Sequence, residues 1–289
     1  MEMRRVMVTH KDLDGVACGI IGKAAYPELE VYYEGYDTVD DRLTEILTSF
    51  KDEGGIIYIT DLSPKSPITA KMLDKFNNQS FRSVLLLDHH ESAKERLQKY
   101  GWANFNIGVC GAMILYTWLS GCTCAHRIKR FSEFIKFVND YDMWEHKYPE
   151  SKQLNYLLAE MGRELFIERC LTRPAEYIND TDELFIRVHV KKLDKYCESS
   201  IKSTISHFDE DGRKVGVVFC DNMYASEVGN HILDNSTFDY VAMIDMRRMT
   251  VSLRSRIVDV GAIAVSKGGG GHKRSAGYKI KVENVGGLL

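Results

Sequence analysis

The most informative stretch of the chain is Ser83-Val84-Leu85-Leu86-Leu87-Asp88-His89-His90. Its apolar run is typical of a buried strand, and it leads directly into one carboxylate and two imidazoles. A carboxylate beside an imidazole is a common means of orienting a histidine that binds a metal or transfers a proton. The stretch therefore predicts a fold in which a buried strand brings reactive side chains to its C-terminal end.

The first apolar segment, Arg4–Thr9, leads into a dense group of ionisable residues. Alternation along an extended chain would place His10, Asp12 and Asp14 on one side, and Gly15 would open a helix. Ionisable groups crowded beside a buried strand repel one another and lose hydration unless a cation balances them. This segment therefore indicates a cation site.

Carboxylates also follow a third apolar segment and a helix-like segment. Asp61 follows Ile56–Thr60, whereas Asp140 and Asp142 follow Arg127–Val138. Taken singly, each aspartate could be a turn former or a helix cap. Carboxylates beyond the C-terminal ends of strands nevertheless lie where open α/β sheets bind ligands. Their joint occurrence with the stretch 83–90 favours one shared site.

The candidate metal ligands are His10, Asp12, Asp14, Asp61, His89 and Asp140. Four carboxylates and two imidazoles carry too much charge for one ion but suit two divalent ions that share a bridging ligand. Nitrogen and oxygen donors without a thiolate favour manganese, with magnesium or cobalt as alternatives. Two such ions sharing a hydroxide predict hydrolysis of a phosphoester without a covalent enzyme intermediate. Asp142 is left outside this set, as a support for Asp140.

Composition limits the class of protein. The 289 residues, 44% of them hydrophobic, can bury one large core or two ordinary ones. The formal charge of −3 argues against a protein that coats long duplex nucleic acid, because such binders carry a large basic excess. No apolar stretch approaches the roughly 20 residues that cross a bilayer, so we expect no membrane association. The odd number of cysteines, seven, shows no disulfide framework and favours a reducing, cytoplasmic setting.

A second metal motif is conceivable at Cys122-Thr123-Cys124-Ala125-His126. It lacks a second pair of ligands at the spacing that zinc sites use. Gly121 and Thr123 instead favour an ordinary turn between helices.

Apolar strands and helical patterns alternate in the first part of the chain. Strand-like runs lie near 4–9, 30–34, 56–60 and 83–88, and helical patterns at 16–25, 42–50 and 68–77 separate them. Such alternation predicts an α/β domain with a parallel sheet and helices on both faces. We assign residues 1–180 to this catalytic domain, 181–210 to a long helical connector and 211–289 to a smaller α/β domain with a mixed sheet.

Four glycines, Gly268–Gly271, precede His272 in the smaller domain. Glycines let a backbone approach an anion closely, and successive N–H groups can form a nest around it. A flexible linker is the alternative, but the apolar stretch Ala276–Ile280 returns the chain to a strand. We therefore expect a substrate-binding loop that includes Gly269, Gly270 and Gly271.

The ordered motifs resemble those of the DHH phosphoesterase superfamily. They are His10-x-Asp12-x-Asp14-Gly15, Asp61, Asp88-His89-His90 and Asp140, and the segment 268–277 resembles the glycine-rich signature of the DHH-associated C-terminal domain. The resemblance extends from Val6 to about Ile280 and is specific because it rests on separated motifs. Ser275 stands where the family more often has alanine.

The resemblance implies a role for each motif residue. His10 and Asp12 would hold one metal, Asp14, His89 and Asp140 the other, and Asp61 would bridge them. His90 would contact the scissile phosphate and protonate the departing oxygen, and Asp88 would fix an imidazole tautomer. Arg254 and His272 would contact the phosphates of the substrate.

We expect no extra domains, and in this the chain resembles the compact NrnA-like nanoRNases and 3′-phosphoadenosine 5′-phosphate phosphatases. We expect a phosphodiesterase that uses a metal-bridging hydroxide to cleave very short single-stranded oligonucleotides or related small nucleotides, with a homodimer as one option. Hydrolysis of cyclic or linear signalling dinucleotides is the alternative. A pyrophosphatase of this family is disfavoured, because that class carries a different C-terminal domain. A non-catalytic nucleotide-binding module would have lost a ligand, and none is missing here.

Overall fold

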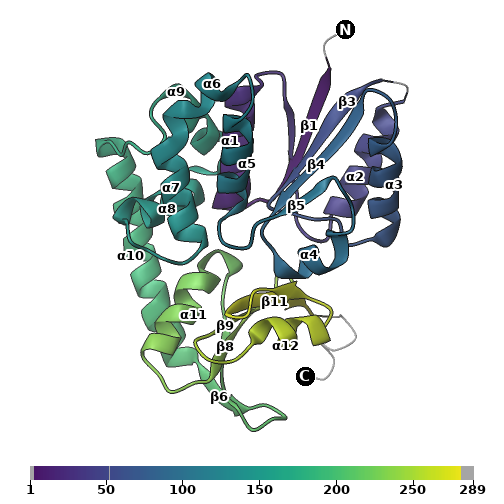
Figure 1. The fold of residues 1–289 in the computed structure, drawn as a ribbon. Helices are drawn as coiled ribbons and strands as arrows, with labels where there is room; N and C mark the ends of the chain where they lie inside the picture. The colour runs from purple at the N-terminus through teal and green to yellow at the C-terminus, as the bar shows by residue number, and fades with distance from the viewer. Residues whose placement is uncertain (1–2, 52, 281–289) are drawn as a thin grey trace. The chain divides into compact units, whose positions relative to one another are not determined.

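The computed structural model describes residues 3–51 and 53–280, which form two compact units that divide between Ile186 and Arg187 (Figure 1). The division lies within helix α10, Asp180–Ser203. The predicted helical connector, 181–210, is helix only as far as Ser203, because Ile205–Phe208 is strand β6, which pairs with β7 (Lys214–Phe219). Among the described residues, no helix is long and apolar enough to cross a membrane. All seven cysteines are free thiols.

The first unit contains a parallel sheet of five strands in the order β2-β1-β3-β4-β5. The strands are β1 (Arg4–Thr9), β2 (Glu30–Tyr33), β3 (Gly55–Thr60), β4 (Arg82–Asp88) and β5 (Ala103–Phe105). The three central strands are continuous runs of mainly Val, Ile, Leu and Met, as parallel strands covered on both faces require.

Helices cover both faces of this sheet. The helices of this unit are α1 (Leu13–Ala25), α2 (Val39–Ser49), α3 (Pro67–Asn77), α4 (Glu91–Leu97), α5 (Gly111–Ser120), α6 (Ala125–Ile128), α7 (Ser132–Asp142), α8 (Pro149–Met161) and α9 (Arg163–Thr172), with a 3₁₀ turn at Lys129–Phe131. Helices α2 and α3 pack on one face, where Leu43 and Leu73 meet Val8, Ile59 and Leu86. Helices α1 and α5 lie on the other face (Figure 1). The expected α/β class is confirmed.

The second unit contains a mixed sheet of six strands in the order β10-β11-β9-β8-β7-β6. Strands β7 (Lys214–Phe219) and β8 (Tyr240–Asp245) are parallel, and β9 (Thr250–Ser255), β10 (Gly270–Gly271) and β11 (Ser275–Lys279) pair antiparallel. Its helices are α11 (Ala225–Asp234), preceded by a 3₁₀ turn at Asn222–Tyr224, and α12 (Val260–Ser266). Ala242 packs in the cluster with α12, whereas the next residue, Met243, approaches Gly229 of α11. The two helices therefore cover opposite faces.

A buried ion pair joins α9 to α10 in the first unit. The guanidinium of Arg169 donates from Nη2 to Oδ2 of Asp182 at 3.0 Å and from Nη1 to the carbonyl of Ala175 at 2.7 Å. Arg173 donates to Oδ1 of the same carboxylate at 2.7 Å. Asp182 is fully buried, so its carboxylate depends on these two cations for neutralisation.

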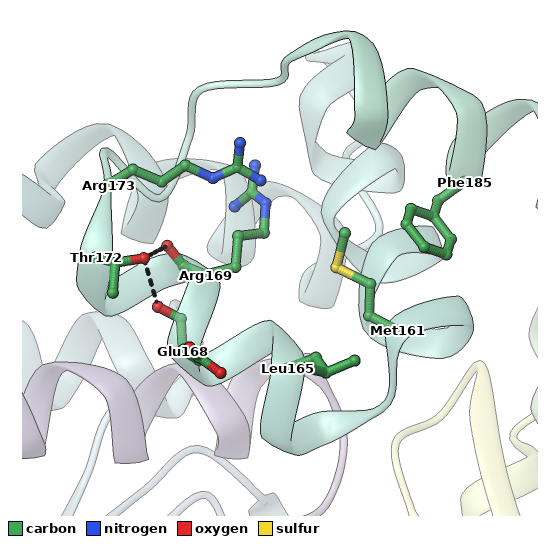
Figure 2. A pocket seen from close by; sticks show the side chains of 7 residues that line it. All are labelled: Met161, Leu165, Glu168, Arg169, Thr172, Arg173 and Phe185. Atoms are coloured by element: carbon green, nitrogen blue, oxygen red, sulfur yellow. Dashed lines mark hydrogen bonds between the residues drawn. The ribbon is translucent and has the colours of Figure 1, made fainter.

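Figure 2 shows the two guanidinium groups beside a cavity of about 310 Å³ between these helices. Met161, Leu165, Glu168, Arg169, Thr172, Arg173 and Phe185 line it. Because the arginines already bind Asp182 and backbone carbonyls, we interpret this cavity as a feature of helix packing.

Replacing Asp182 with alanine should destabilise the first unit strongly. Arg169 would remain buried without its carboxylate, and breaking a buried pair in this way costs about 3–5 kcal/mol. Chemical denaturation of the full chain measures the effect. The control is Glu164→Ala, which removes an exposed pair with Arg163 and should leave the midpoint nearly unchanged. Equal, small effects of both substitutions would contradict the structural role of Asp182.

Candidate metal centre

The C-terminal ends of three adjacent strands bring the predicted residues together. Thr9, Thr60 and Leu87 are register partners across β1, β3 and β4. Neighbouring strands lie about 4.8 Å apart, so the residues that follow these partners leave the sheet at one edge. This edge receives His10, Asp61 and the Asp88-His89-His90 triplet.

Asp61 occupies the centre of the cluster. It is 2% exposed and has a positive φ of 53°, a left-handed conformation that costs a non-glycine residue about 1 kcal/mol or more. Its Oδ1 lies 3.2 Å from Nε2 of His89. Its Oδ2 is buried and, among the residues described, has no hydrogen-bond donor. Such a buried carboxylate oxygen calls for a cation.

The Oδ2 side of Asp61 faces one set of ligand atoms. Nδ1 of His10 lies 3.9 Å from Asp61 Oδ2 and 2.7 Å from Asp12 Oδ2. Asp12 is also the N-cap of α1, since its Oδ1 accepts the N–H of Gly15 at 3.1 Å. The chain therefore turns into helix at Leu13, and the expected extended alternation through Asp14 is wrong, although both carboxylates reach the cluster.

The Oδ1 side of Asp61 faces a second set, formed by Asp14, His89 and Asp142. Nε2 of His89 lies 3.8 Å from Asp14 Oδ2 and 3.7 Å from Asp142 Oδ2. An octahedral ion with ligands at about 2.1 Å separates adjacent ligand atoms by about 3 Å and opposite ones by about 4.2 Å. The distances around His89 fall within this range.

The N-terminus of α5 holds Asp14 in place. Gly111 and Ala112 donate their backbone N–H groups to its two carboxylate oxygens, each at 2.7 Å. A side chain on Gly111 would put its Cβ 2.7 Å from the Cβ of Asp61, so only glycine fits there. The positive end of the helix also favours a carboxylate. These donors could not be predicted from the sequence, because no local pattern links segments 97 residues apart.

The structure places Asp140 away from the clusters of potential ligands that its described residues form. Its Oδ1 accepts the N–H of Lys147 at 2.9 Å and its Oδ2 accepts the N–H of Tyr148 at 3.3 Å. Asp140 therefore orders the turn after α7. The expectation that Asp140 belongs to the cluster is corrected in favour of Asp142.

Asp140 and Asp142 point to different sides of α7. Asp142 follows Ile135 by seven residues and Val138 by four, so it lies on the same side of α7 as these two buried residues. Asp140 is two residues away and points about 200° around the helix from Asp142. Because Asp140 is itself buried, the phase of the apolar residues alone does not choose between the two aspartates.

The electrostatics of the cluster fit divalent cations. Burial and the charges of Asp14 and Asp12 raise the pKa of Asp61 and the pKa of Asp142 well above the usual range of a carboxyl group. Burial and neighbouring His90 lower the pKa of His89, which keeps its imidazole neutral as a metal ligand must be. Asp12, Asp14, Asp61 and Asp142 together balance the charge of two divalent ions.

Hydrogen bonds to Asp88 connect the members of the Asp88-His89-His90 triplet. Asp88 is fully buried and accepts hydrogen bonds from Nδ1 of His90 at 2.7 Å, from the backbone N–H of His89 at 2.7 Å and from the Ser63 hydroxyl. Burial alone would lower the pKa of His90, but the Asp88 carboxylate raises it to about 9. Asp88 thus contacts both the His90 imidazole and the backbone at the end of the strand.

The predicted substrate-binding residues lie in the second unit. Arg254 is on β9, where Nη2 donates to the Ser226 hydroxyl at 2.6 Å. The amides of Gly269 and His272 donate to the carbonyls of Ala264 and Ser275. A Cβ on Gly269 would lie 2.1 Å from the carbonyl oxygen of Gly277, so this glycine permits close packing of the β10–β11 hairpin.

No family model matches the chain, whereas individual relatives do. It is 27% identical over 296 residues to the oligoribonuclease NrnB of Bacillus subtilis, an alignment covering 96% of this chain and 73% of that protein. It is also 27% identical over 149 residues to a 3′,5′-cyclic-nucleotide phosphodiesterase of Helicobacter pylori, covering 48% of this chain and 43% of that one.

Solved structures share the fold at low sequence identity. The DHH domain of a member of the s1p family of ribosomal proteins matches 99% of this chain and 85% of its own, with a TM-score of 0.70 and 13% identity. RecJ of Thermus thermophilus in complex with Mn²⁺ matches 99% of this chain and 50% of its own, with a TM-score of 0.63 and 11% identity. In its ordered motifs and its fold the chain resembles the DHH superfamily, and its similarity to NrnB extends over nearly the whole of this sequence.

Proposed function

We propose that the chain is a metal-dependent phosphodiesterase that hydrolyses very short oligonucleotides or related small nucleotides. The observation that carries the proposal is Asp61, whose two buried oxygens face two separate sets of imidazole and carboxylate ligands. Two-metal sites of this donor type serve hydrolysis of phosphoesters. The relation to an oligoribonuclease over 96% of this chain supports the substrate class.

In this proposal, His10 and Asp12 would hold one ion, Asp14, His89 and Asp142 would hold the other, and Asp61 would supply a carboxylate oxygen to each. When bound, the ions would supply a Lewis acid for the phosphoryl oxygens and an activated water as nucleophile. Manganese is the preferred ion, because the site lacks thiolates and mixes imidazole with carboxylate. The fold shared with RecJ, solved in complex with Mn²⁺, agrees with this choice.

His90 provides the acidic group of the site. Asp88 binds its Nδ1, which fixes the orientation of the ring, while Nε2 lies 2.9 Å from the Tyr36 hydroxyl. With the pKa of His90 raised to about 9 by Asp88, the imidazole keeps its second proton at neutral pH, and the positive charge attracts a phosphate.

Arg254 and His272 of the second unit are proposed to bind the phosphates of the substrate. The Ser226 hydroxyl holds the Arg254 guanidinium, which presents several donors in a fixed plane suited to phosphate. Gly270 and Gly271 are proposed to allow the substrate close to the β10–β11 hairpin, whereas the amide of Gly269 is already used inside the unit.

A second candidate is hydrolysis of a cyclic nucleotide or a signalling dinucleotide. The similarity of about half of this chain to a cyclic-nucleotide phosphodiesterase favours it. Both candidates use the same cleavage chemistry and differ only in the nucleotide that is accepted.

The proposed ligand set can be tested by exchanging two aspartates. Asp142→Asn should weaken Mn²⁺ binding at least about tenfold and raise the melting temperature of the metal-free protein, because it removes a repelling carboxylate. Asp140→Asn should keep the Mn²⁺ affinity but lower stability by about 1–3 kcal/mol, since two backbone amides lose a charged acceptor. Calorimetric titration and thermal unfolding measure both. The reverse pattern would restore Asp140 as the ligand.

Metal binding should release protons. Asp61 and Asp142 have raised pKa values in the folded state, so between about pH 4 and those values the folded chain holds more protons than the unfolded chain. The metal-free protein therefore loses stability as pH rises through this window, and the gain in melting temperature from Mn²⁺ grows. Titration in two buffers of different ionisation enthalpy measures the released protons. Identical apparent enthalpies in both would contradict the coupling.

A substrate panel tests the function itself. With Mn²⁺, the wild-type chain should hydrolyse di- to pentanucleotides faster than 3′-phosphoadenosine 5′-phosphate, cyclic dinucleotides or pyrophosphate. Asp61→Asn should reduce every activity to background and weaken Mn²⁺ binding, whereas Asp41→Asn, an exposed aspartate of α2, should change neither. Preference for a cyclic dinucleotide would support the second candidate. Full activity of the Asp61 variant would remove the bridging role.

A further inference from the structure

Tyr36 lies against two histidines of the first unit. They are His90, the proposed acidic group, and His10, a proposed metal ligand. Its hydroxyl is 2.9 Å from Nε2 of His90, and its ring packs edge-on to the His90 ring with centroids 5.9 Å apart. Its ring centroid also lies 5.1 Å from that of His10. Tyr36 is 38% exposed, so solutes can reach it.

The loop that carries Tyr36 is ordered by its own hydrogen bonds. Glu34 is 8% exposed, and its carboxylate accepts the Thr38 hydroxyl at 2.7 Å and Nε of Arg42 at 2.8 Å. The Thr38 hydroxyl in turn accepts the N–H of Gly35 at 3.1 Å, and Glu34 donates its N–H to the carbonyl of Thr9 on β1. These contacts fix the position of Tyr36 before any substrate binds.

Both ring nitrogens of His90 therefore have partners, Asp88 at Nδ1 and Tyr36 at Nε2. A departing oxygen can be reached in two ways. It can displace the phenol from Nε2, in which case Tyr36 competes with the substrate. Otherwise it can bind the phenol hydroxyl, in which case Tyr36 connects His90 to the substrate.

We propose that Tyr36 is a catalytic residue whose hydroxyl hydrogen bonds to the departing oxygen and passes it the proton of His90. This inference rests on the proposed phosphodiesterase function. Three observations carry it: the phenol already contacts Nε2, its loop is fixed, and it is accessible from solvent. Asp88, His90 and Tyr36 then form one hydrogen-bonded chain that ends at the substrate.

The step balances as follows. A water oxygen bonds to phosphorus while the bond from phosphorus to the departing oxygen breaks, and the electron pair stays on that oxygen. The Tyr36 hydroxyl gives this oxygen its proton and accepts the Nε2 proton of His90. Tyr36 ends unchanged, and His90 is reprotonated by solvent, which receives the proton released from the attacking water.

The test is Tyr36→Phe, which removes only the hydroxyl, assayed with Mn²⁺ on two esters. On a dinucleotide, whose departing alkoxide needs a proton, kcat should fall roughly a hundredfold, the scale of general acid catalysis, with little change in KM. On bis-p-nitrophenyl phosphate, whose p-nitrophenolate leaves without a proton, kcat should stay nearly unchanged. The control Tyr32→Phe removes a hydroxyl that contacts Glu30 and should affect neither ester.

Other outcomes overturn the assignment. Dinucleotide hydrolysis that is unchanged or faster in Tyr36→Phe would mean that the phenol merely occupies Nε2 and is displaced. Equal losses on both esters, or a lowered melting temperature with matching losses, would reduce Tyr36 to a structural role. A wild-type chain inert toward both esters would overturn the proposed function and this inference with it, whereas an active wild type with an unimpaired variant overturns Tyr36 alone.

Discussion

The crowding of carboxylates around Asp61 is the constraint on which the first unit depends. Asp14 and Asp61 are almost fully buried, and their neighbours Asp12 and Asp142 add like charge. Ion pairs with lysine or arginine do not relieve this crowding among the residues that the structure describes; the imidazoles and the N-terminus of α5 take their place. A cluster of this kind opposes folding unless protons or cations neutralise it, so the fold maintains it at a cost to stability.

The parallel sheet is what makes such crowding attainable. Parallel strands end at one edge, and the register that pairs Thr9 with Thr60 and Thr60 with Leu87 aligns the ends of β1, β3 and β4. Each strand contributes one or more charged groups within about two strand spacings, or 10 Å. The connecting helices then supply what strands cannot: Asp14 from the first turn of α1, backbone donors from α5, and Asp142 from the last turn of α7.

The sequence was sufficient for the parts of this arrangement that local patterns encode. Apolar runs located the strands, and ionisable residues at their ends located the site, because period and turn chemistry are local properties. The choice between Asp140 and Asp142 required knowing which side of α7 meets the cluster, because two residues reverse the face of a helix and only tertiary packing decides which face is used. Gly111 and Tyr36 had no local signal, since their contacts with Asp14 and His90 join segments that only tertiary packing brings together.

The glycine-rich segment shows how one composition serves different physical purposes. A nest for an anion needs N–H groups that point outward, but the amides of Gly268, Gly269 and His272 donate to carbonyls within the same unit. Amides used in this way are not available to a phosphate without breaking the β10–β11 hairpin. In our proposal, phosphate recognition by this unit would therefore fall mainly to cationic side chains such as Arg254, whose guanidinium donates to the Ser226 hydroxyl. Selectivity among nucleotides would then depend on the placement of these side chains, and not on the carboxylates at the ends of the parallel strands.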